Sequence, residues 1–69
     1  MRVTYDAQAD ALYLYFKEGK VARTAEAGDG IQFDYDAEGH IIGIEILGYS
    51  TRVDPEALRS VSVNLPLAG

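Results

Sequence analysis

The stretch that decides the fold is IQFDYDAEGHIIGIEIL, residues 31–47. Apolar residues alternate with polar or small ones on both sides of an acidic turn at residues 36–39. Such alternation is typical of a half-buried β-strand, because successive side chains of a strand point to opposite faces. The stretch therefore predicts a β-hairpin. A loop at 36–39 with an even number of residues keeps the apolar side chains on one face and predicts the cross-strand pairs Tyr35–His40, Phe33–Ile42 and Ile31–Ile44.

The same alternation extends toward the N-terminus. Further strands are predicted around residues 3–5, 12–16 and 21–26, separated by turn residues at 6–10, 18–19 and 28–30. The loop that begins at Asp6 aligns Tyr5 with Leu12. The sequence thus predicts a mainly β fold (small α+β): an antiparallel β-meander of about five strands in a single domain, residues 1–69.

The last third of the chain has a different pattern. Asp54 is a good helix N-cap, Pro55 suits the first helical position, and Glu56 complements the helix dipole. A short helix over about residues 55–60 is expected. Apolar residues at every second position from 61 to 65, stopped by Pro66, indicate a last strand as well.

Composition excludes several classes of function. The chain has 69 residues, no cysteine, one histidine and a net charge of −5, so it forms neither a disulfide nor a multi-histidine metal site. Its six Lys and Arg residues are scattered, which argues against nucleic-acid binding. No apolar run approaches the ~20 residues of a membrane span, and no charged start followed by an apolar stretch marks a signal peptide. The cytoplasm is the expected location.

Small size favours self-association. A domain near 60 residues buries only about 60% of the surface that its unfolded chain exposes, and this one has no disulfide to compensate. We expect a homo-oligomer, with the dimer favoured. One face of the predicted sheet carries Tyr13, Tyr15 and Leu47, which are candidate interface residues because tyrosine tolerates one dry and one wet end. The alternative is a half-exposed tyrosine pair on an edge strand.

The most specific chemical motif is acidic. Asp34, Asp36, Glu38, Gly39 and Glu45 have the spacing of an EF-hand calcium loop. An EF-hand needs helices on both sides, however, whereas the flanks here have the period and composition of strands. On paired strands Glu45 lies several residues from the turn, at about 3.4 Å per residue, and cannot fold back to chelate. We therefore expect an acidic turn and no metal site.

Longer stretches of the chain resemble a known family. The segments YDAQADALYLYF (5–16), GKVARTAEAGDGIQFDYDAEGHIIGIEIL (19–47) and STR (50–52) are similar to domain of unknown function 2283. The resemblance covers residues 1 to about 52 and implies a small, mostly antiparallel β domain of bacterial origin without an assigned reaction. Some members are thought to occur beside small toxin-like proteins, which implies an antitoxin-like or partner-binding role.

Three hypotheses of function follow. The first is a non-enzymatic interaction module that is homo-oligomeric and binds a basic protein partner. The second is a small-ligand or metal-binding protein that uses acidic residues at a subunit interface; its candidates are the two turn aspartates and the two motif positions that folding explains least, Asp34, Asp36, Glu26 and Glu45. An enzyme ranks last, because no pairing of nucleophile and base is readable. No catalytic residue and no cofactor is predicted.

Overall fold

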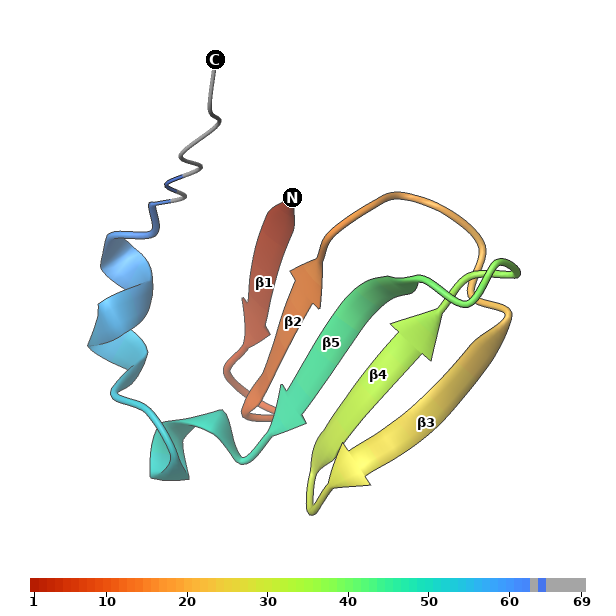
Figure 1. Cartoon of the computed structure of the whole chain (residues 1–69). Coiled ribbons are helices and arrows are strands. Elements are labelled where there is room, and N and C mark those ends of the chain that lie inside the picture. Colours follow the sequence, from red (N-terminus) through yellow and green to blue (C-terminus); the bar gives the residue numbers. More distant parts are fainter. Residues whose placement is uncertain (63, 65–69) are drawn as a thin grey trace.

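The described part of the chain is a single antiparallel β-sheet followed by two short helices. The computed structural model describes residues 1–62 and 64 (Figure 1). The five strands lie in the order β1-β2-β5-β4-β3. Their bounds are β1 Arg2–Asp6, β2 Ala11–Tyr15, β3 Arg23–Gly28, β4 Ile31–Tyr35 and β5 Ile41–Leu47. The predicted mainly β, antiparallel fold of about five strands is confirmed.

The first hairpin has the predicted register, with Tyr5 opposite Leu12. The second hairpin, β4–β5, does not. Phe33 lies opposite Ile44 instead of Ile42, and Ile31 opposite Ile46 instead of Ile44. The prediction was wrong by two residues.

The physical cause of the shift is a wider turn. Asp36 N–H donates to the carbonyl of His40 at 2.9 Å, and Gly39 takes a positive φ of 85°, so the turn spans residues 36–40. That length alone would exchange the two faces of one strand. An irregularity between Asp34 and Tyr35 adds a second one-residue shift and returns the apolar side chains to one face.

The register gives the sheet two distinct faces. On the apolar face, one row runs across all five strands through the cross-strand partners Val3, Leu14, Ile44, Phe33 and Ala25. On the polar face, the neighbouring row contains Thr4, Tyr13, Glu45, Gln32 and Glu26. The alternation seen in the sequence therefore places the apolar side chains on one face of the sheet and the polar ones on the other.

Two 3-10 helices follow the sheet, η1 at Tyr49–Thr51 and η2 at Pro55–Arg59. The predicted cap is present, because the Asp54 side chain accepts from the N–H of Glu56 at 3.0 Å. The helix is a 3-10 turn that ends one residue earlier than predicted. Of the predicted last strand, residues 61, 62 and 64 lie in no strand, while Val63, Leu65 and Pro66 fall outside the described residues.

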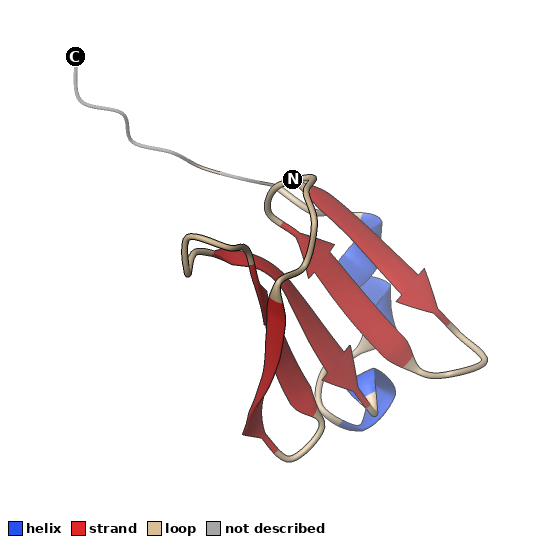
Figure 2. Cartoon of the chain, turned by 90° about the vertical axis from the view of Figure 1, so that its right-hand side faces the viewer, coloured by secondary structure: helices blue, strands red, loops and turns tan. Residues whose placement is uncertain are grey.

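The core is small and lies toward one edge. Three large apolar side chains are buried among the described residues, namely Leu12, Ile42 and Tyr49. Figure 2 shows a strongly twisted sheet with both helices grouped near β1 and β2. In the described part of the chain, no helix has the length and apolar character needed to cross a membrane.

Candidate functional site

A continuous chain of side chains crosses the polar face. The rings of Tyr13 and Tyr15 on β2 lie together, with centroids 4.2 Å apart. On the β1 side, the Arg2 guanidinium lies over the Tyr15 ring at 3.8 Å from its centroid. Arg2 also forms an ion pair with Glu18 at 3.3 Å. The sequence placed the two tyrosines on one face, and the structure brings them into direct contact there.

On its other side, this chain of contacts reaches β4 and β3. The Tyr13 hydroxyl donates to Asp34 Oδ2, and the Thr24 hydroxyl donates to Asp34 Oδ1 at 2.6 Å. The Tyr13 ring reaches Asp34 by passing over Gly43 of β5. A Cβ atom at Gly43 would lie 2.6 Å from the Tyr13 oxygen, so only glycine leaves room for this path.

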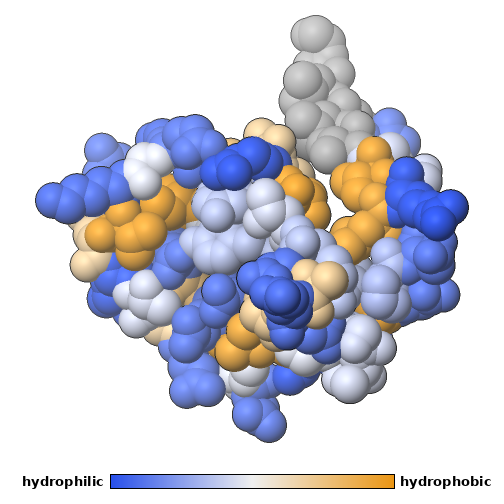
Figure 3. All heavy atoms as spheres, turned by 180° about the vertical axis from the view of Figure 1, so that it is seen from behind, coloured by the Kyte–Doolittle hydropathy of each residue, from blue (hydrophilic) through white to orange (hydrophobic). Residues whose placement is uncertain are grey.

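The two glutamates lie beside this chain of contacts. Glu45 is the cross-strand partner of both Tyr13 and Gln32, and Glu26 is the partner of Gln32 on the far side. The glutamates thus lie two strands apart, about 9–10 Å at the usual strand spacing. Within the described residues neither forms an ion pair. Figure 3, a view from behind, shows a largely hydrophilic surface with separate hydrophobic patches on this side.

Two of the predicted residues lie away from this centre. Leu47 ends β5 on the polar face and is 40% exposed. The Asp36 carboxylate is occupied by its own turn, because it accepts from the N–H groups of His40 and Glu38, each at 2.9 Å. The donation from the backbone of His40 is the main cause that holds the pKa of Asp36 below its ordinary value.

The predicted carboxylates therefore do not converge on a metal ion. Asp36 binds backbone, Asp34 binds two hydroxyl groups, and the glutamates are separated by a strand. Residues 1–62 and 64 hold no group of three or more side chains with metal-ligating spacing. Within the described residues, the arrangement offers a polar surface with two adjacent tyrosine rings and two glutamates that form no ion pair.

Sequence reasoning missed a clamp between the first turn and the helices. Asp10 accepts from the Tyr5 hydroxyl at 2.5 Å, from the Ser50 hydroxyl at 2.7 Å and from the Ser50 N–H at 3.0 Å. Its own carbonyl accepts from Tyr49 N–H at 3.1 Å. Asp10 has a φ of 52°, a conformation that aspartate tolerates better than most residues.

The clamp shifts the pKa values of Asp10 and Tyr5 in opposite directions. The Tyr5 hydroxyl and the two Ser50 donors hold the pKa of Asp10 below its ordinary value. The same bond to Asp10 raises the pKa of Tyr5. The sequence near Asp10 does not predict this clamp, because its partner Ser50 lies forty residues away and the positive φ of Asp10 shows only in the structure. Ser50 lies in the STR segment of the family resemblance, which gave no hint of its partner.

A second tie was missed at the opposite side. Arg52 Nε donates to the carbonyl of Leu47 at 3.0 Å, and its Nη2 donates to the carbonyl of Asp29 in the β3–β4 turn. Arg52 thereby joins the segment after β5 to that turn. Asp10 and Arg52 therefore both join a turn of the sheet to the segment that follows β5.

Comparison with known proteins identifies the family. Neither the curated proteins nor the solved structures gave a match. A family model described as a protein of unknown function (DUF2283) matches residues 2–50, from β1 to the second residue of η1. The resemblance noted in the sequence is confirmed over this range. The chain therefore belongs to the DUF2283 family of proteins of unknown function.

Proposed function

We propose that this protein is a non-enzymatic interaction module that works as a homo-oligomer, with the dimer favoured, and that binds a basic protein partner in the cytoplasm. The observation that carries the proposal is the small core. Only three large apolar side chains are buried among the described residues, and none of these side chains is less than 2% exposed. A sheet needs a second layer on its apolar face, and one chain supplies that layer only in part.

The state of the predicted carboxylates supports a binding role over a catalytic one. Asp34 and Asp36 are hydrogen-bonded within the chain, so both carboxylates already have a role in the local structure. Glu26 and Glu45 form no ion pair within the described residues and lie on the polar face. A cationic segment of a partner can neutralise them there.

The net charge supports the same choice of partner. A chain with a charge of −5 attracts basic surfaces over a distance set by the ionic strength. The antitoxin-like role implied by the family resemblance is one form of this proposal, since it requires an acidic module that binds a basic protein. The absence of cysteine does not contradict a cytoplasmic location.

Native mass tests the self-association. Light scattering coupled to gel filtration, from about 10 to 500 µM, should give about twice the chain mass of 7.5 kDa at the upper concentrations. A mass of one chain at every concentration would contradict the homo-oligomer.

A model cation tests the partner. An oligo-arginine peptide should bind with an affinity that falls steeply as salt is raised, because the attraction is between charges. Glu26→Gln with Glu45→Gln should weaken that binding severalfold. The matched control, Glu18→Gln with Glu56→Gln, removes the same charge from residues that already pair with Arg2 and Arg59. Equal losses in both double variants would contradict a specific site on the polar face.

A further inference from the structure

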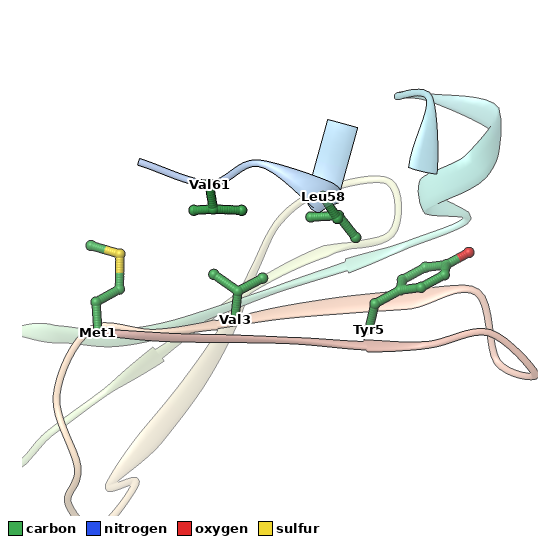
Figure 4. Close-up of a pocket in the computed structure, with 5 residues that line it drawn as sticks. All are labelled: Met1, Val3, Tyr5, Leu58 and Val61. Carbon is green, nitrogen blue, oxygen red and sulfur yellow. The ribbon is translucent and has the colours of Figure 1, made fainter. Parts of the chain in front are cut away.

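Among the residues that the structure describes, those that cover the apolar face lie at the β1 edge. Figure 4 shows Val3 and Tyr5 of β1 pointing toward Leu58 and Val61 of the segment around η2. Even here the packing is loose, since these residues and Met1 line a cavity of about 470 Å³. Met1 and Val61 remain 69% and 56% exposed. The helices therefore form only a partial lid over one edge strand.

In the described part of the chain, no helix covers the rest of the apolar face. In Figure 1 no helix crosses β5, β4 or β3. Ile42 of β5 is buried, but the other large apolar side chains here and on neighbouring β2 are only half-buried; they are Leu14, Ile31, Phe33, Ile44 and Ile46. Phe16 extends the face beyond β2, where its N–H donates to the carbonyl of Ile42 at 2.9 Å, and it is 39% exposed.

We propose that the apolar face formed by β5, β4 and β3 binds the same face of a second copy of this chain, so that the two sheets stack as a β-sandwich. This inference rests on the homo-oligomer of the proposed function and names its surface. Stacked sheets lie about 10 Å apart with interdigitated side chains. The partner sheet would thus supply the layer that the helices do not reach.

Charge explains why the second copy meets this face and not the polar one. A two-fold dimer places one patch against the same patch of its partner. The two central rows of the apolar face contain no charged side chain; they are Val3, Leu14, Ile44, Phe33 and Ala25, and Tyr5, Leu12, Ile46, Ile31 and Gly28. On the polar face, the same symmetry would bring together two copies of a patch that contains the carboxylates of Glu26 and Glu45.

The dimensions of the three-strand face suit a small dimer interface. The three strands β5, β4 and β3, spaced about 4.8 Å apart and roughly 20 Å long, give an outline of about 14 by 20 Å. Side-chain relief raises the accessible area above this outline. Even so, the face is smaller than the roughly 800 Å² that each partner buries in an interface of standard size, and it suits a weak dimer that forms at high concentration.

A contact measurement on the unmodified chain tests the surface directly. Equal amounts of isotope-labelled and unlabelled protein are mixed, and only nuclear Overhauser effects between the two kinds of chain are recorded. We expect such effects between the Ile44 methyl groups and the Phe33 ring. Effects that involve the Tyr13 ring, or backbone amides along an edge strand, would overturn the proposed surface while leaving the homo-oligomer intact.

A matched pair of variants provides the second test. Phe16→Glu and Leu47→Glu add the same charge at positions of nearly equal exposure, 39% and 40%, on opposite faces. Phe16→Glu should weaken self-association at least tenfold, because it puts a carboxylate into an apolar contact. Leu47→Glu should leave it within about twofold. Circular dichroism confirms that each variant is folded.

The outcomes separate the two proposals. Dissociation by Leu47→Glu but not by Phe16→Glu assigns the interface to the polar face and overturns the inference. An unmodified chain that stays monomeric at about 500 µM overturns both the inference and the proposed homo-oligomer. If Phe16→Glu does not fold, the labelled mixture alone decides the surface.

Discussion

The two faces of the sheet differ in what one chain can satisfy. On the polar face, Tyr13, Asp34 and Thr24 meet their hydrogen-bonding needs across three strands of one sheet. On the apolar face, Phe33 and Ile44 are adjacent yet remain half-exposed. Hydrogen bonds are short and directional, so neighbours in one layer can complete them. Burial requires a second layer, and that difference is why this small sheet satisfies the hydrogen bonds of Asp34 on one face and leaves Phe33 and Ile44 half-buried on the other.

Gly43→Ala, on the polar face, should cause the largest loss of stability. The new Cβ would lie 2.6 Å from the Tyr13 oxygen, so the ring must leave Gly43 and its bond to Asp34. We expect a loss of about 1–3 kcal/mol in the free energy of unfolding, measured in urea. In a Tyr13→Ser background the same change should be neutral or stabilising, because alanine is a better strand residue than glycine when nothing overlies it.

The control for this sign reversal is Gly28→Ala. An added Cβ there would meet nothing within 4 Å. It should cost far less than Gly43→Ala in the wild-type background. If both alanines destabilise equally, or if the Tyr13→Ser background does not change the sign, the Tyr13 ring does not determine the identity of residue 43.

Raising the protein concentration should raise Tm if the apolar face is covered by a second copy of the chain. If a second copy completes that face, the folded dimer gains stability by mass action as the chain becomes more concentrated. A hundredfold increase should raise Tm by roughly 5–10 °C for a domain of this size. Differential scanning calorimetry at about 5 and 500 µM measures it. A Tm that does not move with concentration would show that one chain is stable with the face uncovered.

The sequence predicts those parts of the fold that depend on residues close together in the chain. Alternation is local, and it correctly identified all five strands and the pairing of Tyr5 with Leu12. The register of β4 with β5 depended on two compensating irregularities, the wider turn and the shift beside Tyr35. Each irregularity alone would move the apolar side chains of one strand to the other face of the sheet. Two together restore the original face, so the alternation of apolar residues is the same in two registers that differ by two residues.

The candidate site shows the same limit. The face that carries Tyr13, Glu45 and Asp34 follows from strand period and was predicted, with Glu26 added by the family resemblance. Their partners were not predicted, because contact between Tyr13 and Asp34 depends on strand order, which places β5 between β2 and β4. Asp10 and Ser50 meet across forty residues for the same reason.

Asp10→Asn should weaken the clamp between the β1–β2 turn and η1, and so lower Tm. Asparagine tolerates the positive φ of this position, so the change removes charge without adding backbone strain. The pKa of Asp10 in the folded chain is below its value of 3.8 in a model compound, so its contribution is present above about pH 4 and is lost as pH falls through the folded value. At pH 7 the variant should lose about 5 °C in Tm.

Below pH 4 the wild-type and Asp10→Asn curves should converge, since the acid form of Asp10 also lacks the charge. Asp29→Asn is the control, because its side chain forms no hydrogen bond within the described residues. Thermal melts from pH 7 to pH 2.5 measure both variants against the wild type. Curves for Asp10→Asn and the wild type that stay parallel down to pH 2.5 would show that the Asp10 charge does not contribute to the clamp.

The smallest effect is expected at the cap of η2. Asp54→Ala removes the acceptor for Glu56 N–H, a change worth about 0.5–1 kcal/mol in a full helix. Here it should fall at or below that range, because η2 spans only Pro55–Arg59 and contributes one half-buried side chain, Leu58, to the β1 edge. Hydrogen exchange should quicken at residues 55–59 and stay unchanged in the sheet. Asp54→Ser, which keeps an acceptor, should restore the wild-type rates. A global loss as large as that of Asp10→Asn would instead mean that η2 belongs to the cooperative core, and the covered edge would then be as complete within one chain as the polar face is.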